Sequence, residues 1–348
     1  MSLFSQEKSM IGEEKQNQLA KLIQKSFPIC AEPYAQLAGE LDIDEVSVID
    51  QLKEWKNTGI LREVSAVMEG SALGYESALV CGRVPESSID KVAELVAKHP
   101  TVTHCYKRRH DYNLWFTIAV PEDMPLQKTI EILENLTDIP KLYPLRRTLS
   151  FKIGVNFDLI SKTNITERIE LSNHIPHLEL NPSVKQIIRL IQTDLPICHR
   201  PFLELASGNS GLESEILQFL KDNLHQAVRR YIATYRHRNL GVKANGMVVW
   251  HVPENKLSGF GHRLAGYSEV SHCYARETFP GFKYNVYSMI HAPTLEKLWD
   301  MADKISSELG CGDYLVMDST VEYKKCRLRY FLPELNHWWG KHEKLVMA

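Results

Sequence analysis

Two short stretches of the sequence place a tyrosine two residues after a histidine, and both side chains can take part in proton transfer. They are His104–Tyr106 and His272–Tyr274, each with the sequence His-Cys-Tyr. In an extended strand the histidine and the tyrosine point to one face and the cysteine to the other. An imidazole on such a face can act as a proton donor or as an axial ligand of an iron atom. Because the histidine recurs in both stretches, both are candidate catalytic residues, and a structural role is the alternative.

Further aromatic side chains and a third histidine follow these stretches. Tyr112 follows the first stretch and Tyr284 the second, and we predict that both take part in the chemistry with the two histidines. Trp115 is expected to pack against a flat ligand, and His291 is a further binding candidate. Aromatic residues at these positions are equally typical of a sheet core, so a structural role stays open.

Basic side chains gather in a few segments although the whole chain is nearly neutral. With 41 Lys and Arg against 43 Asp and Glu, the net charge is −2, so no overall positive field attracts nucleic acid or an anionic membrane. Guanidinium groups bind carboxylates through paired hydrogen bonds, so the clusters favour an anionic ligand. For any single one of these residues, a solvated strand end is the competing interpretation. The predicted binding residues are Arg108, Arg109, His110, Arg146, Arg147, Arg236, His237, Arg238, Arg276, Lys324 and Lys325.

Cysteine usage and apolar runs limit the class of protein. The seven cysteines form no Cys-x-x-Cys pair, and their odd number argues against a set of disulfides. No group of ligands has the spacing of a structural zinc site, so no metal site is predicted. The sequence lacks an apolar run of the roughly 18–20 residues that a membrane span needs, and it lacks an apolar signal segment. A cytoplasmic protein without a membrane partner is therefore expected.

The chain contains two copies of one unit. Pro28–Cys30 returns as Pro196–Cys198 at a separation of 168 residues, and the two His-Cys-Tyr stretches keep the same separation. After an insertion of four residues the separation becomes 172, so Tyr112 matches Tyr284. The simplest interpretation is a covalently linked pseudo-dimer, and further self-association stays open.

Within each copy the apolar spacing changes from helical to strand-like. Steps of three and four residues over 19–55 predict three short helices before a wing strand at 59–64, as in winged helix-turn-helix modules. From residue 78 the predicted order is β-α-β-β-α-β, that of a ferredoxin-like domain, and the second copy has a longer hairpin at 275–283. The predicted class is α+β. The predicted parts are a flexible N-terminus (1–16), helix-turn-helix module 1 (17–72), ferredoxin-like domain 1 (73–156), a linker (157–182), module 2 (183–239), domain 2 (240–332) and a C-terminal tail (333–348).

This order of domains resembles the Lrp/AsnC family of transcription regulators. Two motifs, THCYxR…YNLWFT at 103–117 and SHCYxR…YNxYxMIH at 271–291, are instead similar to those of the siroheme decarboxylases, which share that architecture. The resemblance spans nearly the whole chain and implies that both subunit types are fused in it. It implies that siroheme is the substrate and that its acetate carboxyls at C12 and C18 leave as CO2, which gives 12,18-didecarboxysiroheme in haem biosynthesis. It also implies that no cofactor is needed beyond the iron of siroheme.

A haem- or metabolite-sensing regulator of the Lrp/AsnC type is the alternative function, and it would need basic DNA-reading helices. Residues 42–56 carry five acidic residues against two lysines, a net charge of −3, and residues 207–222 carry a net charge of −2. Both segments would repel DNA, so packing is the favoured role for them and no DNA partner is expected. A non-catalytic tetrapyrrole carrier is a third interpretation.

The two copies differ at their basic clusters. Residues 236–238 (RHR) correspond to residues 68–70 (MEG) of the first copy, and residues 108–110 (RRH) give way to a longer hairpin after Arg276. Equivalent sites of a true homodimer cannot diverge in this way. We predict that the two pockets are unequal and that one of them retains full activity, with basic groups from both halves.

Overall fold

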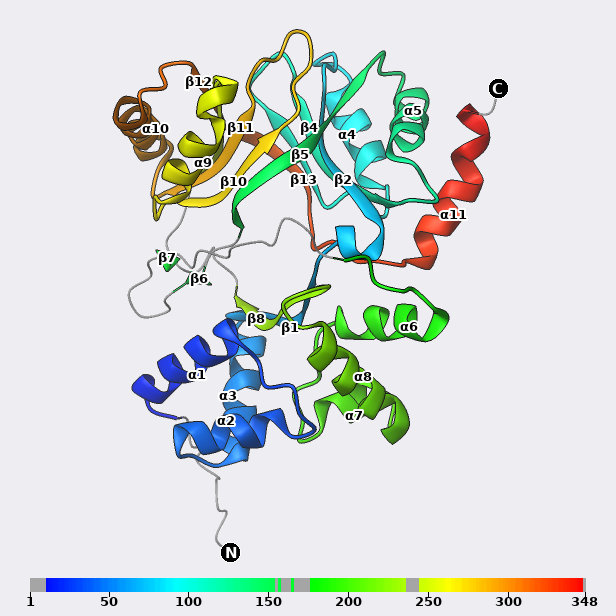
Figure 1. Cartoon of the computed structure of the whole chain (residues 1–348), viewed down its shortest axis with the longest axis vertical. Coiled ribbons are helices and arrows are strands. Elements are labelled where there is room, and N and C mark those ends of the chain that lie inside the picture. Colours follow the sequence, from blue (N-terminus) through cyan, green and yellow to red (C-terminus); the bar gives the residue numbers. More distant parts are fainter. Residues whose placement is uncertain (1–10, 154–155, 158–163, 166–175, 236–243, 347–348) are drawn as a thin grey trace, which may run out of the picture. The chain divides into compact units, whose positions relative to one another are not determined.

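The chain folds into two compact units, and each unit contains elements from both copies of the repeat. The computed structural model describes residues 11–153, 156–157, 164–165, 176–235 and 244–346. One unit holds the two helix-turn-helix modules, and the other, which we call the sheet unit, holds the two ferredoxin-like domains (Figure 1). The predicted α+β class and tandem organisation are confirmed.

The helix-turn-helix unit pairs two modules of three helices and one strand. Asp44 begins the third helix by accepting a hydrogen bond from the backbone N–H of Ser47 (2.9 Å), as an N-cap residue does. The two strands pair antiparallel, so each predicted wing strand pairs with that of the other copy. The elements are α1 (Glu13–Lys25), α2 (Pro33–Leu41), α3 (Glu45–Asn57) and β1 (Leu61–Met68), then α6 (Pro182–Ile191), α7 (Pro201–Leu205), α8 (Ser210–Asn223) and β8 (Val228–Tyr235).

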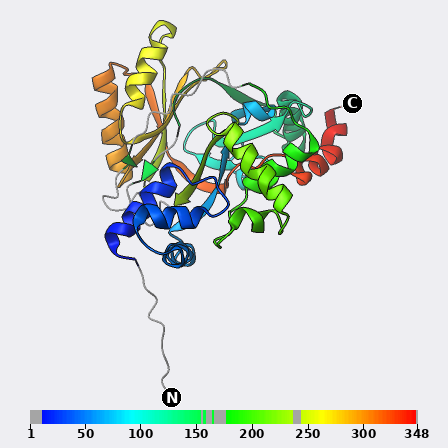
Figure 2. The same cartoon turned by 60° about the horizontal axis from the view of Figure 1, so that its bottom comes forward.

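The sheet unit contains two ferredoxin-like domains whose helices cover one face of their strands. Apolar residues of the helices and alternate residues of the strands form one core in each domain. Figure 1 shows α4 and α5 on one side of the strands and α9 and α10 on the other, and Figure 2 shows the same separation. Domain 1 has η1 (Ser71–Leu73), β2 (Tyr75–Gly82), α4 (Ile89–Ala97), β3 (His104–Arg108), β4 (Leu114–Pro121), α5 (Leu126–Thr137) and β5 (Leu142–Ile153); domain 2 has β9 (Ala244–Trp250), η3 (Glu254–Lys256), α9 (Leu257–Ala265), β10 (Val270–Arg276), β11 (Val286–Ala292), α10 (Leu295–Leu309) and β12 (Tyr314–Met317).

The last strands of the two domains cross to the other domain and join all these strands in one sheet. Its order is β12-β9-β11-β10-β5-β2-β4-β3-β13. Strand β5 pairs with β2 through residues 142–146 and with β10 through residues 147–153. Strand β13 (Ser319–Lys325), which follows β12 of domain 2, pairs with β3 of domain 1. This reciprocal exchange ties the two copies together through backbone hydrogen bonds.

A third apolar cluster, which we call the central layer, lies on the strand faces that are turned away from the helices. It combines residues of both domains, so the two strand faces pack against each other in the middle of the sheet unit. Side chains that point into this layer can therefore contact both copies. The buried members are Leu79, Cys81, Tyr112, Trp115, Leu145, Met247, Val249, Phe282, Tyr287 and Met317.

The predicted linker and C-terminal tail both contain regular structure. In the linker region the short strands β6 (Asn156–Phe157) and β7 (Asn164–Ile165) pair with each other. The tail forms α11 (Pro333–His342) and η4 (Glu343–Val346). Its Trp338 ring lies edge-on to the ring of His99 in domain 1, with centroids 4.2 Å apart. Within the described residues, no helix is both long and apolar enough to cross a membrane.

Two glycines of α9 offer a test of the packing where β5 enters domain 2. A Cβ at Gly261 would lie 2.3 Å from the ring of Phe151, whereas a Cβ at Gly259 would meet nothing within 4 Å. We expect Gly261→Ala to lower the free energy of unfolding by about 1–3 kcal/mol. Gly259→Ala should raise it by about 0.5–1 kcal/mol, because alanine loses less backbone entropy in a helix. Urea unfolding of both variants measures the difference, and equal effects would refute this packing.

Candidate active site

Domain 1 presents a histidine, a tyrosine and an arginine at alternate positions of β3. We call His104, Tyr106 and Arg108 the first ladder. Cys105 belongs to the core under the helices, so by strand alternation the three ladder residues point to the side of the central layer. The placement of histidine and tyrosine opposite the cysteine agrees with the predicted alternation.

Domain 2 repeats this arrangement on β10. His272, Tyr274 and Arg276 form the second ladder, and Cys273 lies in the core under α9 and α10. The guanidinium of Arg276 lies 5.7 Å from the ring centre of Tyr287, a member of the central layer. Both ladders therefore flank the same layer.

The ladder arginines reach across to the other copy. Nη1 of Arg108 donates a hydrogen bond to the carbonyl oxygen of Met317 (2.6 Å), and Nη1 of Arg276 donates one to that of Leu145 (3.0 Å). Leu145 and Met317 are counterparts in the repeat, so the two bonds are equivalent. Arg108 is only 5% exposed, and burial lowers its pKa to about 10. Burial also lowers the pKa of Arg276.

Both buried guanidinium groups have a donor that no described residue uses. The Nε atoms of Arg108 and Arg276 have no hydrogen-bond partner among the described residues. Leaving a buried donor unsatisfied costs about 1–3 kcal/mol, so a ligand carboxylate in hydrogen-bond reach would be favoured. The guanidinium groups also lie over the tyrosines of their own ladders, 5.3 Å from the ring centre of Tyr106 and 5.4 Å from that of Tyr274.

The imidazole of the first ladder contacts two hydroxyl groups. Nδ1 of His104 lies 3.0 Å from Oγ1 of Thr103 and 3.4 Å from Oγ1 of Thr117. The two threonine hydroxyls are 2.6 Å apart and form a hydrogen bond with each other. These contacts fix one side of the His104 ring.

The imidazole of the second ladder has a different environment. The counterpart of Thr117 is Met289, which pairs with His272 across the strands. Ser271, the counterpart of Thr103, forms its short contact with Nε2 of His291 (2.7 Å), whereas Nδ1 of His272 lies 3.4 Å from the hydroxyl of Tyr274. The two ladders thus share residue types but differ around their histidines.

The charge of Lys325 acts on a histidine of its own copy from a position beside the first ladder. Burial lowers the pKa of His291 to about 4, and the positive charge of Lys325 contributes to the same shift. Lys325 pairs with His104 across β13 and β3. The charge of a lysine beside the first ladder therefore reaches a histidine of domain 2.

Tyr112 and Tyr284 lie at the hairpin ends of their domains, away from the ladder histidines. The ring of Tyr112 packs edge-on against Tyr143 (5.7 Å) and Phe279 (5.1 Å), and that of Tyr284 packs against Phe282 (5.2 Å). Burial raises the pKa of both tyrosines. This placement differs from the predicted grouping with the histidines, because the hairpin turn carries the tyrosines to the opposite end of the strands.

Trp115 and His110 support this aromatic cluster. Trp115 is buried in the central layer, and its indole N–H donates to the carbonyl oxygen of Tyr112 (2.7 Å). Nδ1 of His110 accepts a hydrogen bond from the backbone N–H of Tyr112 (3.0 Å), and the two rings stack. Burial lowers the pKa of His110. Both side chains are occupied with protein contacts at the hairpin.

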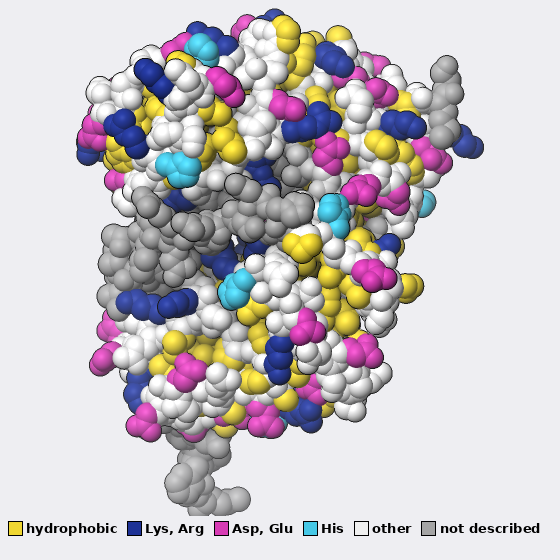
Figure 3. Space-filling view, viewed as in Figure 1, with side chains coloured by type: hydrophobic (Ala, Val, Ile, Leu, Met, Phe, Trp, Pro, Cys, Tyr) yellow, Lys and Arg dark blue, Asp and Glu magenta, His cyan; other side chains and the backbone are white. Residues whose placement is uncertain are grey.

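Two of the predicted binding arginines are neutralised by acidic side chains near the surface. Arg109 is 77% exposed and lies 3.6 Å from Asp318. Arg146 lies between Glu76 (2.5 Å) and Glu277 (3.6 Å). Figure 3 shows the same mixture of basic and acidic side chains across the visible face of the molecule. The buried ladder arginines differ from this surface charge, since their guanidinium groups bond to carbonyl oxygens.

The remaining basic candidates divide between the two faces of the sheet. Arg147 lies beside the second ladder, with its guanidinium 5.8 Å from the ring centre of Tyr274. Lys324 points to the helix side instead, where its ammonium donates to two carbonyl oxygens after α4 (2.7 and 2.9 Å). It therefore does not share a strand face with the ladders. The cluster at 236–238 lies outside the described residues.

Several residues that contact the ladder histidines were not among the predicted site residues. Tyr106 and Tyr274 share a strand face with His104 and His272, and their two-residue spacing in both copies was the available signal. The threonines around His104 carried no such signal, because their contacts depend on the pairing of β3 with β4.

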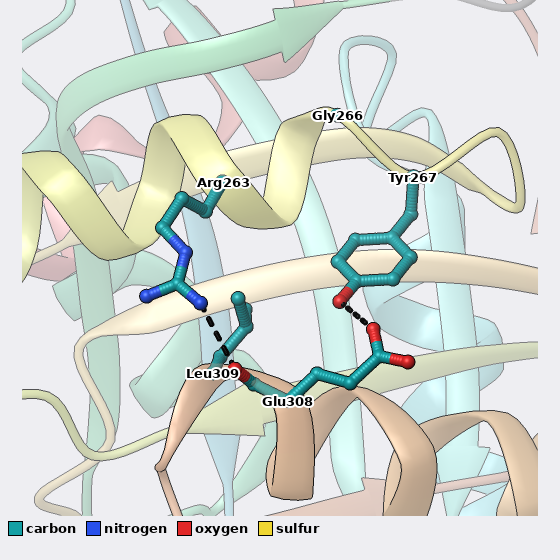
Figure 4. A pocket seen from close by; sticks show the side chains of 5 residues that line it. All are labelled: Arg263, Gly266, Tyr267, Glu308 and Leu309. Carbon is teal, nitrogen blue, oxygen red and sulfur yellow. Dashed lines mark hydrogen bonds between the residues drawn. The ribbon is translucent and has the colours of Figure 1, made fainter.

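A shallow hollow lies on the helix side of domain 2, between the ends of α9 and α10 (Figure 4). Arg263 donates to the carbonyl oxygen of Glu308 (2.9 Å), and the hydroxyl of Tyr267 donates to the Glu308 carboxylate (2.5 Å). These polar groups already form hydrogen bonds with each other, and α9 covers the strands here. The hollow is therefore separate from the ladders. Its lining residues are Arg263, Gly266, Tyr267, Glu308 and Leu309.

Two family models match the chain, and each matches it twice. The model of the siroheme decarboxylase NirDL-like HTH domain matches residues 16–62 and 184–228. The model of the AsnC-like ligand binding domain matches residues 72–152 and 239–324. Two family units are therefore fused in this chain.

Relatives that are named siroheme decarboxylases match the chain over most of its length. A siroheme decarboxylase of Hydrogenobacter thermophilus is 35% identical over 324 residues, which is 92% of this chain and 96% of that protein. The crystal structure of the siroheme decarboxylase NirDL is 30% identical and superimposes with a TM-score of 0.78, covering 96% of this chain and all of that one. A second structure of NirDL, in complex with an iron-uroporphyrin III analogue, matches equally well. The chain therefore belongs to the siroheme decarboxylase family.

Proposed function

We propose that this chain is a carboxy-lyase that removes the C12 and C18 acetate carboxyls of siroheme as CO2, a step of haem biosynthesis. The relative from Hydrogenobacter thermophilus is named a siroheme decarboxylase, and NirDL binds an iron-uroporphyrin analogue. The observation that carries the proposal is the pair of buried arginines, Arg108 and Arg276, each with a spare donor on a face that also presents a histidine and a tyrosine. Such donors suit the several carboxylates of the tetrapyrrole.

The reaction needs a cationic pocket and a proton. When the bond between the acetate methylene and its carboxylate breaks, CO2 leaves and the electron pair stays on the methylene carbon, delocalised into the tetrapyrrole. One proton added to that carbon gives the methyl group, so one carboxylate and one proton become CO2 and a methyl group. In this proposal Arg108 and Arg276 bind carboxylates that do not react, and a ladder histidine supplies the proton.

We propose that the only iron involved enters with the siroheme. A ladder imidazole then acts as the proton donor or as an axial ligand of that iron. The acidic character of the α3 and α8 segments supports packing as the role of the helix-turn-helix unit, with siroheme rather than DNA as the partner.

Anaerobic incubation with siroheme tests the proposed function. We expect mass spectrometry of the tetrapyrrole to detect species lighter by one and then by two CO2, without added nicotinamide, flavin or metal. Loss of mass in equal amounts without the protein would mean a non-enzymatic reaction. An unchanged tetrapyrrole in the presence of folded protein would refute the proposal.

A further inference from the structure

We infer that Thr117 and Thr103 are positioning residues that hold His104 in place as the proton donor. The new methyl groups are then protonated at the first ladder. This inference rests on the proposed function and adds to it which copy does the chemistry. It follows from the hydroxyl contacts of His104 and from the different residues that stand at the same positions beside His272.

The hydrogens of the two threonines determine which nitrogen of the neutral His104 ring carries its proton. Oγ1 of Thr103 contacts both Oγ1 of Thr117 (2.6 Å) and Nδ1 of His104 (3.0 Å). Neither hydroxyl contacts another acceptor among the described residues. The hydrogen of one hydroxyl therefore lies between the two threonine oxygens, and the hydrogen of the other is donated to Nδ1. Both hydroxyl hydrogens find an acceptor in this group only if Nδ1 carries no hydrogen of its own. The ring hydrogen is then on Nε2.

The same contacts also serve the charged ring. After a hydroxyl rotation the oxygen of Thr103 can accept the hydrogen of a protonated Nδ1, so the ring keeps its orientation in both states. The imidazolium then transfers its Nε2 hydrogen to the methylene carbon left by CO2 and becomes neutral. Solvent supplies the next proton.

The second ladder lacks this arrangement because three positions differ between the copies. Met289 replaces Thr117 and brings a thioether in place of a hydroxyl. His291 replaces Ala119, and its Nε2 lies 2.7 Å from the hydroxyl of Ser271, which also donates to the carbonyl oxygen of Met289 (3.3 Å). The hydroxyl that corresponds to Thr103 therefore contacts His291 and the carbonyl oxygen of Met289. The contact of His272 with the Tyr274 hydroxyl, at 3.4 Å, is long for a hydrogen bond.

Three variants test the role of Thr117 in siroheme turnover. Thr117→Val keeps the shape but removes the hydroxyl, and we expect kcat to fall about three- to tenfold while KM changes less than about twofold, as for one lost hydrogen bond. Thr117→Ser should restore most of kcat. Met289→Leu, the matched change in the second copy, should leave kcat within about twofold of the unchanged chain. Equal kcat for Thr117→Val and the unchanged chain, or equal losses for Thr117→Val and Met289→Leu, would overturn the inference.

A measurement without substrate separates this inference from the proposed function. The ¹⁵N chemical shifts of the His104 ring report which nitrogen carries the hydrogen. We expect the Nε2–H form in the unchanged chain and a mixture of both forms in Thr117→Val. An Nδ1–H ring in the unchanged chain would overturn the positioning role of the threonines even if siroheme is decarboxylated. Failure to decarboxylate siroheme would instead refute the proposed function, and with it the transfer of a proton from His104.

Discussion

Replacing His104 by alanine should lower siroheme turnover by about a hundredfold or more, the usual loss when a general acid is removed. Replacing His272 should mainly change binding or stability, because Met289 stands beside it where Thr117 contacts His104. Rates measured at saturating siroheme compare the two variants. If both ladders worked equally, each single variant would keep about half the activity and only the double variant would be inactive.

Folding has to be checked in the same variants, since a half-buried histidine also contributes to the stability of the sheet. Circular dichroism and thermal unfolding of both variants serve as the control. Matching half-losses in two folded variants would show two working sites and refute the unequal ladders. Full activity in both would reduce His104 and His272 to structural residues.

Loss of the buried guanidinium of Arg108 should weaken siroheme binding by about tenfold or more. A charge-assisted hydrogen bond contributes about 1.5–3 kcal/mol, and each 1.4 kcal/mol is about tenfold in affinity. The loss from Arg109→Ala should be smaller, because Arg109 is exposed to solvent beside Asp318. Titration of siroheme into each variant, at two salt concentrations, measures the affinities, and Arg263→Ala in the hollow on the helix side is the control.

The Arg108 result must be separated from a loss of folding, since Arg108→Ala also leaves the carbonyl oxygen of Met317 without its donor. Arg108→Lys keeps the charge but not the planar pair of donors, so it should fold better and still bind siroheme more weakly. Unchanged affinity in both Arg108 variants would place the carboxylate site elsewhere in the chain.

The local elements of this fold could be predicted from the sequence because they depend on short-range spacing. Apolar steps of three and four residues marked α1 to α3, and the alternation around Cys105 and Cys273 placed the histidines and tyrosines of the ladders on one face. The repeat at 168 and 172 residues gave the correspondence of the two copies, which the two matches of each family model confirm.

The exchange of strands could not be predicted in the same way, and several site assignments depended on it. Residues 319–325 belong to the second copy in the sequence, but the strand β13 that they form pairs with β3 of the first copy. This pairing turns Lys324 to the helix side, opposite Cys105, and places Lys325 opposite His104. Which neighbour an edge strand takes depends on long-range packing rather than on local pattern.

The burial of Arg108 was also beyond sequence reasoning. Within the run of basic residues 107–110, Arg108 and Arg109 are equally charged neighbours, but alternation turns one to the central layer and the other to solvent. The carbonyl acceptor of Arg108 comes from Met317, at the end of a strand of domain 2. Only the packed arrangement of both domains reveals which arginine is suited to a buried carboxylate.

A time course of siroheme conversion in deuterated water tests the central claim most directly. Decarboxylation with proton delivery from an exchangeable histidine predicts a product that has lost two CO2 and carries one deuterium in each new methyl group. His104→Ala should form this product at least about a hundredfold more slowly. A tetrapyrrole that keeps both acetate carboxyls, or a product whose new methyl groups contain no deuterium, would contradict the account.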